Sequence, residues 1–276
     1  MRSRAMVREM RGAYAFIERN INLIKRYWGW ELVWLVYSLT NALAITYIGN
    51  GMSAITGQVI DTQAVVKYLL VGALIWQYLS VIFYAISEMI AWERWEGTIE
   101  YTFMAPVSRP THLVGTTLFA IGYGVVRTLA ILAIVTAFFR LDLSGANILG
   151  AVLMLLAGSV SFVGLGICAA VLPLLYPERG AQMTNAVAAI LLLISGVYYP
   201  IETLPNWLHP IAKLSPATYV IQGMRSCLID GQGTRTLLPT VGLLIATGLV
   251  VIAIGLVVFR YVETYAKRAG RLKRSG

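Results

Sequence analysis

The stretch "AWERWEGTIEYTFMAPVSRP", residues 91–110, interrupts an otherwise strongly apolar chain. It places three glutamates and two arginines within twenty residues and closes with Pro106 and Pro110. The apolar runs on either side, 67–90 and 112–139, each exceed the roughly 20 residues that a membrane-spanning helix needs. The polar stretch therefore predicts where one span ends and the next begins, in a segment outside the bilayer.

The composition of the chain agrees with this interpretation. Only 13% of its 276 residues are charged and its mean hydropathy is +0.72, whereas about 25% of the residues of a soluble domain are charged. Only helices and closed barrels can span a bilayer, and these runs have the length of helices. We predict an all-α membrane protein with six transmembrane helices, at 30–49, 67–90, 112–139, 146–175, 183–199 and 239–261.

Lysine and arginine are concentrated on one side of this predicted topology. Segments 1–28, 91–111, 176–182 and 262–276 together hold 15 of the 22 basic residues. Basic loops stay on the cytoplasmic side of a membrane, so we expect a multi-pass protein with both termini in the cytoplasm. The same distribution argues against nucleic-acid binding as the meaning of the net charge of +9.

Residues 12–28, "GAYAFIERNINLIKRYW", are too polar to span the bilayer but show an amphipathic pattern. Apolar side chains recur at steps of three and four, and the charged ones lie mainly off that stripe. This pattern predicts a helix that lies in the cytoplasmic interface. The alternative is an ordinary helix packed on a soluble domain. The stripe consists of Tyr14, Ile17, Ile21, Ile24 and Trp28.

Residues 200–231 lie on the predicted outer side and are divided by four prolines, which interrupt helices. Ser215 followed by Pro216 is typical of a helix start, and a helix could run from there to Ile229 and end at Asp230-Gly231. It is apolar but too short to span. We expect short helices on or in the outer leaflet between the fifth and sixth spans, and the alternative is a plain surface loop.

Two motifs resemble the membrane subunit of ABC-2 type transporters, the bacterial exporter permeases. One is "SGVYYPIETLPNWLHPIAKLSPATYVIQGMR", residues 195–225, and the other is "WEGTIEYTFMAPVSRP", residues 95–110. The resemblance covers nearly the whole chain, 1–276, as a single transmembrane domain. It implies a bacterial or archaeal plasma-membrane (cell inner membrane) exporter, for which multidrug efflux is one expected activity.

The resemblance also implies partners. Two six-span permease subunits, as a homodimer or a related heterodimer, would form the pathway in the lipid bilayer. Two separate ABC ATPase subunits would bind ATP and Mg below them. The sequence contains no G-x-x-x-x-G-K-[ST] phosphate loop, so this chain is not expected to hydrolyse ATP alone. We also expect no cofactor, metal site or catalytic residue in this chain, because its two cysteines and two histidines lack the spacing of metal ligands.

In such a transporter, segment 91–110 would be the cytoplasmic coupling element, a short helix in a groove of the ATPase. Helical spacing places the apolar and acidic side chains in adjacent sectors, and a solvated loop is the alternative. The apolar stripe is Trp92, Trp95, Ile99 and Phe103, and the acidic stripe, expected to face the partner, is Glu93, Glu96 and Glu100. Gly97 can break the helix, so the element could begin at Thr98. The expected coupling residues are Glu93, Glu96, Gly97, Thr98, Glu100 and Phe103.

The remaining candidate positions lie within the spans and at their outer end. Arg127 sits in the third run, where a charge normally faces protein or water, and Glu88 is its candidate partner; the alternative is that Arg127 reaches the interface. Small residues make the fourth run suitable for close helix packing. The resemblance implies an outer gate region that contains Tyr198, Tyr199, Pro200, Glu202 and Trp207.

Two other function classes remain open from the sequence. An ion-gradient-driven secondary transporter or channel would be expected to show acidic relays or broken helices near the midplane, and Glu88 is almost the only such signal. A membrane enzyme ranks last, because we find no credible nucleophile–base pair or set of metal ligands in the sequence.

Overall fold

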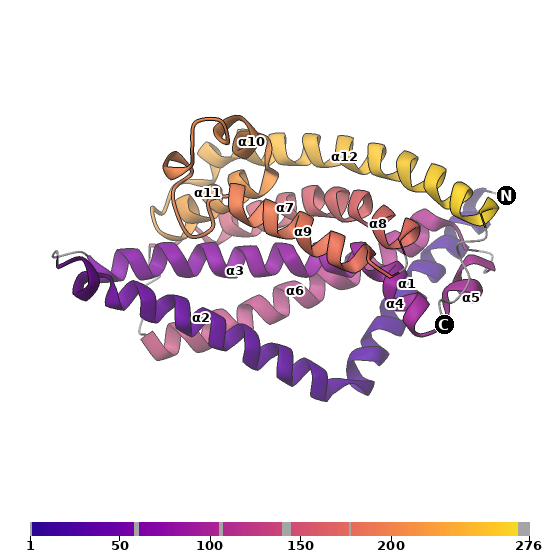
Figure 1. Ribbon diagram of the computed structural model, residues 1–276, viewed down its shortest axis with the longest axis horizontal. Helices are drawn as coiled ribbons and strands as arrows, with labels where there is room; N and C mark the ends of the chain where they lie inside the picture. The colour runs from indigo at the N-terminus through magenta and orange to yellow at the C-terminus, as the bar shows by residue number, and fades with distance from the viewer. Residues whose placement is uncertain (1, 58–60, 105–106, 140–144, 177, 270–276) are drawn as a thin grey trace.

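The computed structural model describes residues 2–57, 61–104, 107–139, 145–176 and 178–269. Every regular element in these ranges is a helix, as predicted (Figure 1). Several of the long helices run along the long axis of the bundle, and others are inclined to it. The elements are α1 (Arg2–Arg26), α2 (Trp28–Thr56), α3 (Thr62–Ser87), α4 (Met89–Trp95), α5 (Ile99–Met104), α6 (Arg109–Phe139), α7 (Ile148–Ala169), α8 (Val171–Leu175), α9 (Gly180–Ile194), η1 (Ile201–Thr203), α10 (His209–Leu214), α11 (Pro216–Leu228) and α12 (Thr234–Arg268).

Five stretches in the described part of the chain are long and apolar enough to cross a membrane: Trp28–Gly49, Thr62–Ser87, Pro110–Phe138, Ile148–Leu175 and Thr234–Arg268. They coincide with five of the predicted spans. The run predicted as the fifth span, 183–199, forms the shorter apolar helix α9, which ends at Ile194. It ends there because Gly196 adopts a positive φ of 67°, a conformation that glycine enters without steric cost.

The two ends of the bundle differ. The short helices α10 and α11 lie at one end, whereas α4, α5, the start of α1 and the end of α12 lie at the other (Figure 1). The final helix is longer than the predicted span 239–261 at both ends, and Pro239 lies inside its first turns. A proline there removes one backbone donor, and the helix tolerates that loss near its N-terminus.

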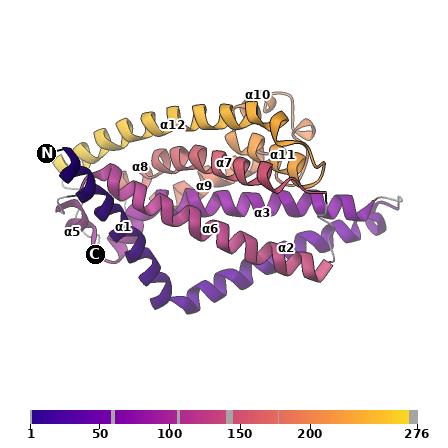
Figure 2. The same ribbon diagram turned by 180° about the vertical axis from the view of Figure 1, so that it is seen from behind.

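Helix α1 is longer than the predicted segment 12–28, and it packs obliquely along α6 before meeting α2 at an elbow near Tyr27 (Figure 2). The contact with α6 is close, because a Cβ on Gly115 would lie 2.6 Å from the carbonyl oxygen of Ala13. Tyr14 and Trp28, from the predicted apolar stripe, are exposed. Ile21 is exposed as well, whereas Ile17 and Ile24 are half-buried. The stripe is therefore only partly covered by the bundle, and its position in a membrane interface stays a prediction.

Close packing of α7 forms the centre of the core, as its small residues predict. A Cβ on Gly158 would meet Val220 of α11 at 2.7 Å, and one on Gly164 would meet Val251 of α12 at 2.9 Å. On the facing helix, a Cβ on Gly248 would lie 2.8 Å from the backbone nitrogen of Ser161. The small residues of α7 thus allow two neighbouring helices to approach its backbone.

Helix α11 starts and ends where the sequence predicts, and it is not part of a plain surface loop. It packs against α3, α7 and α12 with Val220 and Ile221 fully buried. Ser215 occupies the N-cap position but its side chain makes no capping hydrogen bond. Its hydroxyl lies instead 3.0 Å from that of Ser195, which ties the start of α11 to the end of α9.

Candidate functional site

The polar stretch that divides the second and third predicted spans folds as a helical hairpin. Helices α4 and α5 are separated by Gly97, whose φ is 73°, and the chain reverses there. The backbone N–H of Thr98 donates to the carbonyl of Glu93 at 2.8 Å, which closes the turn. The predicted break at Gly97 is confirmed. We call residues 89–104 the cytoplasmic hairpin, after the side of the membrane that the sequence predicts for them.

The prediction of two parallel stripes on one helix is wrong, because the reversal at Gly97 changes which side chains share a face. Trp92 and Trp95 are exposed, whereas Ile99, assigned to the same stripe, is buried in the main core. In the acidic stripe, Glu96 and Glu100 are exposed but Glu93 is buried. The backbone of Phe103 lies in α5, but its side chain is outside the described residues.

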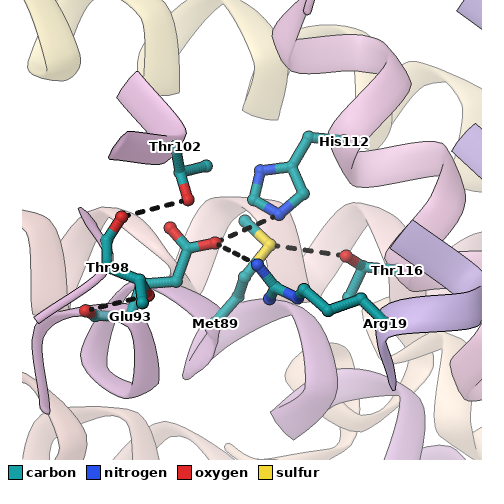
Figure 3. Close-up of polar contacts among 7 residues, drawn as sticks. All are labelled: Arg19, Met89, Glu93, Thr98, Thr102, His112 and Thr116. Carbon is teal, nitrogen blue, oxygen red and sulfur yellow. Dashed lines mark hydrogen bonds and ion pairs between the residues drawn. The ribbon is translucent and has the colours of Figure 1, made fainter. Parts of the chain in front are cut away.

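Glu93 joins three helices in what we call the cytoplasmic polar cluster, Arg19, Glu93 and His112 (Figure 3). Its Oε1 lies 3.4 Å from Nη1 of Arg19 on α1 and 3.3 Å from Nε2 of His112 on α6. The side chain of Glu93 is 1% exposed and that of His112 is 3% exposed. A buried carboxylate is stable only when it is paired, so Glu93 serves the inside of the protein and does not lie on a free acidic surface.

Apolar contacts hold the imidazole of the cluster in place. The ring of Phe16 stacks on that of His112 with centroids 4.1 Å apart, and Arg19 lies 5.6 Å from the centroid of the same phenylalanine ring. Below the cluster, the hydroxyl of Thr116 contacts the sulfur of Met89 at 3.6 Å (Figure 3). Helices α1, α4 and α6 are therefore packed as one unit at this end of the bundle.

A second polar contact ties the first turns of α1 to the start of α6. The carboxylate of Glu9 accepts hydrogen bonds from the hydroxyls of Thr111 and Ser108, the latter at 2.9 Å. These hydrogen bonds, led by that of Thr111, hold the pKa of the Glu9 carboxyl below its ordinary value. Helix α1 is thus held at two points ten residues apart in its sequence, by Glu9 on α6 and by Arg19 on α4.

Arg127 faces protein, but the prediction that Glu88 is its partner is wrong. Its guanidinium donates to the carbonyl of Trp34 at 2.8 Å and to the hydroxyl of Ser38 at 2.6 Å, both on α2. It also donates to Tyr123, whose hydroxyl donates to Glu31. Arg127 therefore joins α6 to α2 and reaches an acidic residue only through a tyrosine.

The separation of Arg127 and Glu88 follows from the antiparallel packing of α3 and α6. Tyr78 of α3 lies beside Gly124 of α6. From that level Glu88 lies ten residues toward the hairpin end and Arg127 three residues the other way, which separates them by about 20 Å at 1.5 Å per residue.

The predicted outer gate residues occupy the turn after α9. Tyr198 is half-buried beside Leu69 and Ala73 of α3, and the hydroxyl of Tyr199 donates to the carbonyl of Leu193. Pro200, Glu202 and Trp207 are exposed. The structure thus brings Tyr198 against the bundle and leaves the last three at the surface.

Sequence reasoning missed the residue that holds this turn, Arg225. From α11, its guanidinium donates to the carbonyls of Gly196 at 2.9 Å, Val197 at 2.7 Å and Tyr68 at 3.2 Å, and it lies 3.4 Å from the centroid of the Tyr68 ring. Burial lowers the pKa of Arg225 to about 10, so it stays charged at neutral pH. In the sequence, this role was indicated by the position of Arg225 at the end of an apolar segment.

A glycine makes room for this arrangement. A Cβ on Gly72 of α3 would lie 2.1 Å from the carbonyl oxygen of Val197 and 2.6 Å from the guanidinium of Arg225. We call Tyr68, Gly72, Gly196, Val197 and Arg225 the outer clasp. It joins α3, α11 and the turn after α9.

A bundle of long apolar helices, with a polar hairpin at one end and a clasped turn at the other, is the architecture of a multi-pass membrane protein. The sequence matches the family model described as ABC-2 type transporter over residues 13–229, and the chain belongs to that family. It is also similar to the "Linearmycin resistance permease protein LnrN" of Bacillus subtilis (strain 168), with 26% identity over 84 residues. That stretch covers 30% of this chain and 22% of that protein.

Family membership confirms the resemblance seen in the sequence. Members are transmembrane components of ABC transporters and are not themselves catalytic, and the family implies association with an ABC ATPase. The cytoplasmic hairpin and the turn after α9 both fall within the matched residues.

Proposed function

We propose that this chain is the pathway-forming subunit of an ATP-driven exporter in the plasma membrane of a bacterium or archaeon. Two copies, or this chain and a related permease, would line the pathway, and two ATPase subunits would supply ATP hydrolysis with Mg. Six spans would put both termini on the same side, and the basic residues of the loops favour the cytoplasm for that side. Helix α9 runs along the bundle between its two ends (Figure 1), and with the turn that follows it we assign it as the fifth span.

The observation that carries this proposal is the exposed face of the cytoplasmic hairpin. Side chains that ordinarily avoid water are exposed there, with Trp95 71% exposed, and acidic groups lie among them. Exposed aromatic and methionine side chains next to charges are typical of protein interfaces. The hairpin face consists of Trp92, Trp95, Glu96, Glu100, Tyr101 and Met104. We assign it as the surface that docks on the ATPase.

The other side of the hairpin supplies the mechanical connection. Ile99 is buried in the main core, and Glu93 is paired with α1 and α6. Closure of two ATPase subunits would move the hairpin, and because it is fixed at these points the movement reaches α3 and α6 as a displacement of packed helices rather than as local bending. Glu93 thus helps to transmit the movement of the hairpin to α1 and α6, and it is not part of the docking surface.

At the opposite end, we assign the turn after α9 as part of the exit gate. Tyr198 packs on α3, and the outer clasp fixes the backbone of Gly196 and Val197. Since the clasp joins α3 to the turn, a displacement of α3 changes the position of that turn. Tyr199, Pro200, Glu202 and Trp207 would move with it.

For the substrate, drug efflux is the class we propose first, because the name of the similar permease refers to linearmycin resistance. Two experiments test the proposal. Vesicles that contain this chain and a P-loop ATPase encoded beside its gene should take up compounds from a drug panel only with ATP present. A reporter fused at Gly276 should be cytoplasmic, and a cysteine at Asn206 should be labelled from outside; cytoplasmic labelling of Asn206 contradicts the six-span topology.

A further inference from the structure

Helix α1 presents three distinct faces along its 25 residues. One packs on α6 through Glu9, Gly12 and Phe16, and on α4 through Arg19. The second is a continuous apolar stripe at alternating steps of three and four residues, and its members that the structure leaves exposed are Val7, Met10, Tyr14, Ile21 and Trp28, the last just beyond the helix at the start of α2. The third face, between these two, is basic.

The third face is basic because the acidic residues of α1 are few and one of them, Glu9, faces α6. The helix has seven basic and two acidic residues. Glu9 faces α6 and contacts Arg8 at 3.9 Å, and Arg19 is paired with Glu93. Arg11, Lys25 and Arg26 are exposed, and among the described residues none of them forms an ion pair.

Only one exposed acid accompanies these cations. At 100° per residue, Glu18 lies between Arg11 and Lys25 on the basic face, and it is exposed. The face therefore keeps a positive balance, and it borders the exposed apolar stripe along the whole helix.

The elbow places this helix beside the first span. Arg26 lies 5.6 Å from the centroid of the Tyr27 ring, and Trp28 and Trp30 follow as exposed side chains at the start of α2. Tryptophan and tyrosine at the end of a span are typical of the headgroup level of a bilayer. An exposed apolar stripe with a basic flank at that level is complementary to a surface that is apolar in its depth and negative at its boundary.

We propose that α1 is a binding surface for anionic phospholipids, with the stripe from Val7 to Trp28 in the acyl region and Arg11, Lys25 and Arg26 on the headgroup phosphates. The inference rests on the proposed interfacial position of α1, and it does not depend on the ATPase. Because α1 is bound to the cytoplasmic hairpin through Arg19 and Glu93, anionic lipid bound to α1 would also help to hold the hairpin in position.

The test uses the full-length chain in proteoliposomes with spin-labelled phosphatidylglycerol and phosphatidylcholine of the same acyl chains. The fraction of immobilised label gives the preference of the protein surface for each lipid. We expect wild type to prefer phosphatidylglycerol, and the preference to fall by up to about fivefold for each surface charge removed in Arg11→Gln/Lys25→Gln/Arg26→Gln. The charge-retaining variant Arg11→Lys/Arg26→Lys should keep it, and high salt should weaken it.

The matched control is Lys213→Gln/Arg235→Gln, which removes exposed cations at the other end of the bundle and should leave the preference unchanged. Equal preference for both lipids in wild type, or an unchanged preference in the triple variant, overturns the proposal. So does an equal loss in the control, which would reflect net charge alone.

A separate measurement distinguishes selectivity for anionic lipid from the interfacial position of α1. A spin label on Tyr14→Cys, with Cys168 and Cys227 changed to serine, reports collision with oxygen dissolved in the bilayer. Contact with lipid but no selectivity would overturn only the anionic assignment. A label accessible to water alone would overturn the interfacial position of α1 as well.

Discussion

Oε1 of Glu93 lies 3.3 Å from Nε2 of His112, and this contact joins the cytoplasmic hairpin to the base of α6. Glu93 lies on α4, before the turn at Gly97, and His112 lies on α6, after the second half of the hairpin. Both side chains are almost completely buried. With Arg19 on the same oxygen, they connect the hairpin to both α1 and α6.

Removal of the Glu93 carboxylate should destabilise the protein. Glu93→Ala leaves Arg19 and His112 without their acid in a buried position, and because Arg19 is partly exposed we expect a loss of about 1–3 kcal/mol. Thermal unfolding in detergent measures the loss. The control Glu96→Ala removes an exposed acid of the same hairpin and should change stability by less than about 0.5 kcal/mol. Equal losses of stability in the two variants would contradict a stabilising role for the cytoplasmic polar cluster.

Docking of the first turns of α1 should weaken in acid. The folded-state pKa of Glu9 lies below the ordinary 4.5, because the carboxylate accepts hydrogen bonds from Thr111 and Ser108. Its contribution is therefore fully present above the ordinary value and is lost as the pH falls through the folded-state value. Protection factors of the α1 amides, which are corrected for the intrinsic pH dependence of exchange, should fall in acid across that range, and Glu9→Gln should remove this dependence. Identical pH profiles in both proteins are the contrary result.

Arg127 should matter for transport because it joins α2 to α6. Arg127→Leu removes donors to Trp34 and Ser38, and we expect a reduced rate of ATP-driven transport. Arg127→Lys keeps the charge and should lose less. The comparison variant is Arg260→Leu, which changes an exposed arginine of α12 and should have little effect. Wild-type transport by Arg127→Leu would show that the link between α2 and α6 is dispensable.

The outer clasp should not tolerate a methyl group at position 72. In Gly72→Ala the new Cβ would lie 2.1 Å from the carbonyl oxygen of Val197, so the turn must move, and overpacking of this kind costs about 1–3 kcal/mol. Gly122→Ala, in open space on α6, should be neutral or slightly stabilising. Thermal unfolding compares them, and labelling of a cysteine at Asn206 reports the turn. Similar unfolding temperatures would contradict the clasp.

The parts of this fold that the sequence predicted are those set by local signals. Apolar runs located the long helices, and Gly97 marked the turn between α4 and α5. Pro216 marked the start of α11, and Gly231 lies just beyond its end. Helix α9 ended earlier than its apolar run because the turn at Gly196 interrupts it. A hydropathy pattern does not distinguish a helix from an apolar turn.

The contacts of the charged residues could not be predicted in the same way, because they join segments far apart in the chain. Arg19 and Glu93 are separated by 74 positions, and Arg225 and Tyr68 by 157. Helical spacing on one segment assigned Glu93 to an outward face, whereas α1 and α6 cover it in the fold. Arg127 was expected to find an acid and instead uses a backbone carbonyl and hydroxyls.

If the exposed face of the cytoplasmic hairpin docks on an ATPase, substitutions on that face should reduce co-purification of the ATPase with this chain. In Trp95→Ala/Glu96→Lys/Glu100→Lys, an exposed aromatic group is lost and repulsion replaces attraction toward a basic partner surface. We predict a severalfold lower yield of complex and a matching loss of ATP-driven transport, with an unchanged unfolding temperature because all three side chains are exposed. The control Trp207→Ala/Glu202→Lys makes comparable changes at exposed positions near the outer turn and should keep the complex. Wild-type yield and transport in the hairpin variant would contradict the account, since the face would then be no more than a solvated surface.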